Sequence, residues 1–207
     1  MPNTPITEII TLTSNIAMKT TSNFQEAVEL LRQSTFEGLQ RIYWGDRVQQ
    51  PGIRQLFIDW ARRPQGSESI VATTAQIKEK LDAVVDSPPT RRLVAFNPFP
   101  TTKCFAAPFT ELIISTVKPE TNLNEFNKIV DASLEVCHDF EGCYGTAWGY
   151  VVDPEGANEV VLMLGWESPE HHVAFMKTEP ARITTAPYVE GVENSTVFYV
   201  QAQDASK

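Results

Sequence analysis

Two adjacent histidines lie in the segment WESPEHHVAFMK, residues 166–177. Imidazole titrates near neutral pH, so it can take up and release protons under physiological conditions. The Ser-Pro pair before the histidines is typical of a helix start and predicts a helix here. His172 then shares a helix face with Phe175, three residues later, whereas His171 points about 100° away. We predict His172 as a general base, with a hydrogen-bonded packing histidine as the alternative.

Other chemical motifs are weak in this sequence. Cys137, His138 and Cys143 are close in sequence, but no fourth ligand is near and they span a predicted helix end and a strand, so zinc is not expected. The sequence has no glycine-rich phosphate loop, GxSxG elbow or HExxH motif. We therefore expect no metal and no other cofactor. Glu8 and Glu111 begin strands that correspond in the two halves of the chain, and we interpret them as rim charges.

Composition narrows the classes of partner. The chain has 207 residues, 42% of them hydrophobic, and a net charge of -9, so it can fill a core but repels phosphate groups. Nucleic acid and anionic membranes are not expected partners. The sequence shows neither a signal peptide nor an apolar run long enough for a membrane span, which favours the cytoplasm. Its three cysteines lack CxxC spacing, which favours reduced thiols.

The chain contains an internal duplication with a period of about a hundred residues. Three pairs of similar segments recur in the same order, and their shared order and spacing indicate a duplicated unit. The pairs are TEIIT (7–11) with TELII (110–114), FEGLQRIYWG (36–45) with FEGCYGTAWG (140–149), and QLFIDW (55–60) with VLMLGW (161–166).

Each half is predicted as strand, helix, strand, strand, helix, strand. In the first half we expect strands at 6–13, 41–48, 54–60 and 92–96, and helices at 24–34 and within 70–85. In the second half we expect strands at 110–117, 143–152, 159–166 and 196–201, a helix capped by Asn124 and ended by Gly142, and a helix from Ser168 to about Thr178. A hairpin turn is expected at 153–156.

The order β-α-β-β-α-β is that of the ferredoxin-like motif, an α+β fold with an antiparallel sheet and both helices on one face. We expect a first repeat at 1–96, a proline-rich connector at 97–108 that is neither helix nor central strand, and a second repeat at 109–207. Strands such as VVLMLGW are apolar at successive positions, which indicates burial on both faces. The two sheets are therefore predicted to pack into one intramolecular α/β barrel, and the protein to be a monomer.

Three segments of the second half resemble a known family. They are Phe-Glu-Gly at 140–142, Trp-Glu-Ser at 166–168 and Glu-His-His-Val-Ala-Phe at 170–175. The chain resembles the dimeric α/β-barrel superfamily and, within it, the antibiotic-biosynthesis-monooxygenase-like (ABM) domains. Members of that superfamily include cofactor-free oxygenases, polyketide cyclases, haem enzymes and stress-response proteins, so the resemblance implies a fold more strongly than a reaction.

The resemblance also implies a ligand cavity between the sheet and the helices of the second repeat. Haem is not expected, because Phe175 lies near the place of the Trp of haem-degrading members and no His follows His172. The first-strand His of the cyclases is absent from both repeats. The residues expected to line the cavity are His172 with the substrate-binding candidates Tyr144, Trp148, Trp166, Phe175 and Met176.

Two functions remain open, and the sequence does not decide whether the protein is an enzyme. One is a small cofactor-free tailoring enzyme of secondary metabolism, an isomerase, cyclase or monooxygenase, that acts by proton transfer on a hydrophobic polycyclic or phenolic molecule. The alternative is a non-catalytic protein that binds small molecules or serves in a stress response. Empty apolar volume beside His172 would favour the enzyme, and side chains that fill that volume would favour the alternative.

Overall fold

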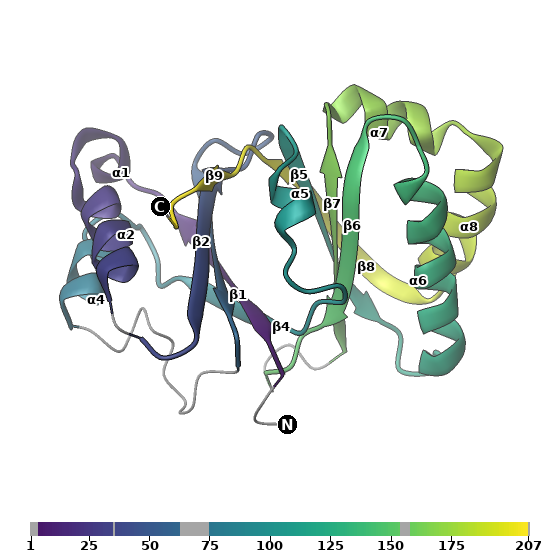
Figure 1. The fold of residues 1–207 in the computed structure, drawn as a ribbon, viewed down its shortest axis with the longest axis horizontal. Helices are drawn as coiled ribbons and strands as arrows, with labels where there is room; N and C mark the ends of the chain where they lie inside the picture. Colours follow the sequence, from purple (N-terminus) through teal and green to yellow (C-terminus); the bar gives the residue numbers. More distant parts are fainter. Residues whose placement is uncertain (1–3, 35, 63–74, 154–157, 207) are drawn as a thin grey trace. The chain divides into compact units, whose positions relative to one another are not determined.

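The computed structural model describes residues 4–34, 36–62, 75–153 and 158–206. The chain divides into two compact units, Met1–Leu93 with Ala202–Lys207, and Val94–Gln201. In each unit the longer helices cover one face of an antiparallel sheet (Figure 1). Packing of the two sheets into one barrel stays a prediction, as do the repeat boundaries. Most of the predicted turn at 153–156 lies outside the described residues.

The first unit has the predicted ferredoxin-like order, and the end of the chain extends its sheet. The strand order is β4-β1-β3-β2-β9, in which β9 pairs with the otherwise outer strand β2. The elements are β1 (Ile6–Thr13), α1 (Ala17–Thr20), α2 (Asn23–Gln33), β2 (Leu39–Asp46), β3 (Ile53–Trp60), α4 (Ala75–Asp82), β4 (Thr90–Val94) and β9 (Gln203–Asp204).

The second unit repeats this topology. Its strand order is β6-β7-β5-β8, which is the order of β2-β3-β1-β4 in the first unit. The predicted duplicated α+β fold is therefore confirmed. The elements are α5 (Thr102–Phe105), β5 (Phe109–Val117), α6 (Leu123–His138), β6 (Cys143–Tyr150), β7 (Glu159–Trp166), α7 (Pro169–Met176), α8 (Glu179–Glu190) and β8 (Val192–Val200).

Helix α6 begins and ends earlier than predicted. The side chain of Asn122, not that of Asn124, caps it by accepting from the backbone N–H groups of Asn124 and Glu125 at 3.0 and 3.4 Å. Asn124 already lies in the first turn, so its own amide needs an acceptor. The helix ends at His138, and Gly142, with φ of 87°, then turns the chain into β6.

Three helices were not predicted, namely α1, α5 and α8. Helix α8 follows α7 after a break at Lys177 and Thr178, and it contains Pro180 and Pro187, residues that disfavour a helix. Pro180 lies in the first turn, where its missing N–H costs nothing, and the Thr178 hydroxyl caps the helix. The connector contains α5, so the prediction of no helix there is wrong. Its prolines lie before and after that single turn rather than within it.

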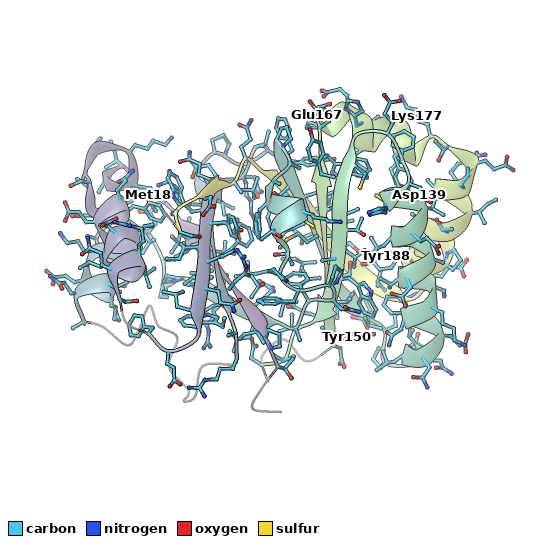
Figure 2. The ribbon with its side chains drawn as sticks, viewed as in Figure 1. Met18, Asp139, Tyr150, Glu167, Lys177 and Tyr188 are labelled. Atoms are coloured by element: carbon cyan, nitrogen blue, oxygen red, sulfur yellow. The ribbon has the colours of Figure 1, made fainter. Side chains whose placement is uncertain are left out.

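The core of the second unit lies between its sheet and α6, α7 and α8. Alternate side chains of β7 face this core, and Tyr188 of α8 stacks on Phe126 and donates to the Ser115 hydroxyl at 2.7 Å (Figure 2). No helix among the described residues has both the length and the apolar character needed to cross a bilayer. The core residues on β7 are Val160, Leu162, Leu164 and Trp166.

Candidate active site

The structure brings three of the six predicted site residues together. Trp166 is fully buried at the end of β7, and its ring stacks on His172 with centroids 5.3 Å apart. Phe175, one turn along α7, packs on the same indole at 5.8 Å. The shared helix face predicted for His172 and Phe175 therefore faces Trp166.

The other three candidates lie apart from this stack. Tyr144 is 44% exposed, and its hydroxyl donates to Glu167. Met176 is 39% exposed at the end of α7. Trp148 donates to Asp131 Oδ1 at 2.8 Å and lines a separate pocket of about 260 Å³ with acidic residues of α6.

Glu111 is the central residue of the site, and its interpretation as a rim charge is wrong. Its side chain is 0% exposed, and Oε2 accepts a hydrogen bond of 2.7 Å from the buried indole N–H of Trp166. Burial raises the pKa of Glu111 to about 7, against the opposing effect of the indole hydrogen bond. The Cys143 thiolate raises the pKa further. A buried carboxyl group thus titrates near neutral pH.

His172 contacts this carboxyl group through one ring nitrogen. Nδ1 lies 3.1 Å from Glu111 Oε1 and also forms a hydrogen bond with the hydroxyl of Tyr199 on β8. Among the described residues, no hydrogen bond to Nε2 is found. The His172 side chain is 18% exposed, so the ring retains some access to solvent. One nitrogen is held by the protein, and the other remains available.

Burial sets the protonation states of the cluster. It lowers the pKa of His172, because removal from water disfavours the charged imidazolium. It raises the pKa of the Tyr199 phenol, which therefore stays neutral. Near pH 7 the cluster holds a neutral imidazole, a neutral phenol and a carboxyl group that exchanges its proton.

In the part of the chain that the structure describes, β8 is an edge strand of the sheet beside the cluster. In the pairing of β5 with β8, Glu111 lies opposite Tyr199 and Ile113 lies opposite Val197. Because side chains two residues apart share a face, these two pairs lie on the same face. Val197 is 47% exposed and Ile113 is half-buried. The exposed Val197 and the half-buried Ile113, which also packs against the core, therefore form a short apolar strip on the face that carries Glu111 and Tyr199.

The first unit contains the same buried pair of a Glu and a Trp, but a different residue contacts the carboxylate. Glu8, on β1, accepts from the indole N–H of Trp60 at 3.3 Å, as Glu111 accepts from Trp166. The guanidinium of Arg91 lies 2.9 Å from the other carboxylate oxygen. A fixed positive charge thus neutralises Glu8, whereas His172 and Tyr199 contact Glu111. Only the second unit has a titratable base at this position among the described residues.

A pattern in the sequence could have located these carboxylates. Glu8 lies two residues from both Ile6 and Ile10 in the same strand, so its side chain points to the same buried face as theirs. Both repeats also pair this Glu with a Trp at the end of the third strand, and a buried indole N–H needs an acceptor. Arg91 and Tyr199 are far from their glutamates in sequence, and only the fold places them.

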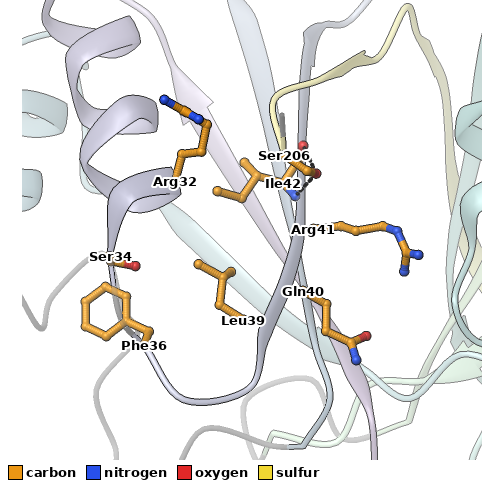
Figure 3. A pocket seen from close by; sticks show the side chains of 8 residues that line it. All are labelled: Arg32, Ser34, Phe36, Leu39, Gln40, Arg41, Ile42 and Ser206. Atoms are coloured by element: carbon orange, nitrogen blue, oxygen red, sulfur yellow. Dashed lines mark hydrogen bonds between the residues drawn. The ribbon is translucent and has the colours of Figure 1, made fainter.

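The first unit also has a pocket, of about 130 Å³, lined by residues of α2, β2 and the chain end. It includes two arginines, but Figure 3 shows the side chains of Arg32 and Arg41 on opposite sides of β2. Arg32 is already paired with Glu29. The two guanidinium groups therefore do not converge on one ligand.

Comparisons with known proteins support the fold. No protein-family model matches the sequence, and no curated protein matches it. A Fusobacterium nucleatum protein that carries the provisional name monooxygenase superposes with a TM-score of 0.70 at 11% identity, over 99% of this chain and 95% of its own. A Lactobacillus acidophilus NCFM protein with the same provisional name superposes with a TM-score of 0.65 at 14% identity, over 98% of this chain and 94% of its own. An anthrone oxidase-like protein superposes with a TM-score of 0.66 at 14% identity, over 100% of this chain and 97% of its own.

These superpositions span both units, so the tandem arrangement is common to the compared chains. At such low identity the likeness is one of fold. It is the duplicated α+β fold with ferredoxin-like repeats that the order of the predicted elements indicates, and that prediction is confirmed.

Proposed function

We propose that the protein is an enzyme that removes a proton from a hydrophobic phenolic or polycyclic small molecule, with His172 as the general base. The observation that carries this proposal is the orientation of the imidazole. Nδ1 lies 3.1 Å from the buried Glu111 carboxyl, and Nε2 has no hydrogen-bond partner among the described residues. This is the arrangement of a base whose second nitrogen is oriented by the protein, here by a hydrogen bond with the Tyr199 hydroxyl and a close contact with the Glu111 carboxyl group.

The proposed chemistry depends on the ionisation of Glu111. When Glu111 is ionised, it accepts the Nδ1 proton of His172, which leaves the Nε2 lone pair available to take a proton from the substrate. The imidazolium formed is stabilised by the adjacent carboxylate. When Glu111 is protonated, this stabilisation is lost. Activity is therefore expected to rise with pH through the pKa of Glu111, which burial raises to about 7.

The apolar strip supports the substrate class. Ile113 and Val197 offer a surface on which a flat ring system can lie with its acidic C–H or O–H group toward His172. The Tyr199 hydroxyl can donate to a substrate oxygen that gains negative charge as the proton leaves. Binding on this open strip requires no deep cavity.

Reaction with oxygen is the outcome that we propose to test first. The structures of similar fold carry the names monooxygenase and anthrone oxidase-like protein. Anthrone loses a proton from its methylene carbon, and the resulting anion can react with oxygen without a cofactor. One anthrone and one O₂ give one anthraquinone and one water, so the substrate supplies all the electrons.

The test uses anthrone as the probe. We expect the purified protein to accelerate oxygen uptake and the appearance of anthraquinone absorbance above the rate in buffer, with saturation at high anthrone concentration. The chain heated beyond unfolding serves as the control for non-specific catalysis by protein carboxylates. A rate equal to that of the heated protein, for anthrone and for a hydroxynaphthalene, would contradict the proposal.

A second function is favoured by the packing around His172. Trp166, Phe175 and Phe140 pack together beside His172, and none of the three pockets described here is lined by His172. This packing favours a protein that binds small molecules on its surface without turning them over. Saturable anthrone binding with no turnover would support that function.

A further inference from the structure

Two cysteines lie together at the point where α6 ends and β6 begins. Cys137, in the last turn of α6, is buried, and Cys143, the first residue of β6, is half-buried. Their sulfur atoms are 3.8 Å apart, with the Cys137 thiol donating to Cys143. The third cysteine, Cys104, is buried and donates to the backbone carbonyls of Gly145 and Met163.

The two thiols differ in reactivity. The hydrogen bond from Cys137 lowers the pKa of Cys143, whereas the same bond and burial raise the pKa of Cys137. Burial raises the pKa of Cys104 to about 12. The thiolate is the nucleophilic form of cysteine, so the more accessible Cys143 is the sulfur that attacks an oxidant.

We propose that Cys143 and Cys137 are a peroxide-reactive pair that closes to an intramolecular disulfide. The Cys143 thiolate attacks one oxygen of a hydroperoxide, the O–O bond breaks, and the sulfur becomes a sulfenic acid as hydroxide or alkoxide leaves. The Cys137 thiol then attacks the sulfenic sulfur, and the S–S bond forms with release of water. Overall, two thiols are oxidised to one disulfide and one peroxide is reduced.

The local structure allows this step. The sulfur atoms must approach from 3.8 Å to about 2.05 Å. Residues 139–142 connect the two cysteines as a turn outside helix and strand. Cys143 lies directly opposite Trp166 in the pairing of β6 with β7, and Trp166 donates to Glu111. The disulfide would therefore form beside the candidate active site, although its formation does not depend on the proposed function.

Peptide mapping tests the inference. The reduced protein is treated with hydrogen peroxide, alkylated and cleaved with trypsin, which leaves Cys137 and Cys143 in the peptide 129–177 and Cys104 in the peptide 104–128. We expect the first peptide to lose the mass of two hydrogen atoms and to take up no alkyl group. The second peptide should keep its alkylated thiol. Reduction with dithiothreitol should restore two alkyl groups to the first peptide.

Serine variants separate the roles of the two sulfurs. Cys137→Ser should stop at a sulfenic or sulfinic Cys143, and Cys143→Ser should lower the rate of peroxide consumption at least tenfold. Cys104→Ser, the matched control, should form the disulfide as the wild type does. The proposal is wrong if the wild-type peptide 129–177 still takes up two alkyl groups after peroxide, or if Cys143 gains oxygen while Cys137 stays reduced. The wild-type map decides the question even if a variant misfolds.

Discussion

His172→Ala is expected to lower kcat/KM for anthrone oxidation by roughly a hundredfold or more, because a positioned general base contributes about that much. The fold should persist, since the ring is stacked at the edge of the aromatic core rather than enclosed in it. Steady-state kinetics and a thermal melt on the same preparation measure both quantities.

His171→Ala is the control for this prediction. His171 lies beside His172 on α7, but its Nδ1 bonds to the Ser168 hydroxyl at 3.1 Å and it does not contact Glu111 in any interaction described. Its loss should leave kcat/KM within a few fold of the wild type. If His172→Ala instead lowers the melting temperature and keeps the activity of each folded molecule, His172 is a packing residue and the base assignment fails.

Glu111→Gln is expected to remove the contribution of this carboxyl group to the pH dependence of stability between pH 4.5 and about 7. The carboxyl group titrates near 4.5 when unfolded and near 7 when folded. The folded state therefore binds the proton more tightly, and its contribution is complete below pH 4.5 and lost as the pH rises through 7. The free energy of unfolding that the wild type loses through this group amounts to about 3 kcal/mol at most. Glutamine keeps an acceptor for Trp166 and has no charge to bury.

The same substitution in the first unit is the matched control. Glu8→Gln leaves the guanidinium of Arg91 without its carboxylate, so it should destabilise the protein by about 1–3 kcal/mol at neutral pH, where Glu111→Gln should not. Urea unfolding of the wild type and both variants at pH 5 and pH 8 gives the six free energies required. If both substitutions lower the free energy of unfolding equally at pH 8, the assignment of a raised pKa to Glu111 is contradicted. Asp59, whose pKa is raised to about 6, is present in both variants and cancels from the comparison.

The sequence predicted the strands well because they are set by local patterns. Alternation and apolar runs place strands such as β1, and the repeated Phe-Glu-Gly and Trp segments place corresponding elements in both halves. Helix α8 was missed because Pro180 and Pro187 look like breakers, although Pro180 occupies the first turn, which tolerates it, and the helix continues past Pro187 to Glu190. The cap of α6 differed by two residues, which is the usual uncertainty of a helix end.

The site was harder to predict because its contacts join distant residues. His172 was found from its type and spacing, and the stack on Trp166 agrees with its predicted helix face. Glu111 was misread because a charged residue at a strand start is commonly exposed. Its burial depends on an indole donor on β7 and a phenol on β8, which only the antiparallel register brings opposite β5.

The central claim is that His172, oriented by Glu111, removes a proton from the bound substrate. Exchange of the methylene protons of anthrone with deuterium oxide in the absence of oxygen reports this step alone, and NMR follows it directly. We expect the wild type to accelerate the exchange well above the buffer rate, with a dependence on pH centred near 7, and His172→Ala to show little acceleration. Exchange that proceeds equally fast with wild type and His172→Ala, or no faster with either than in buffer, would contradict the claim.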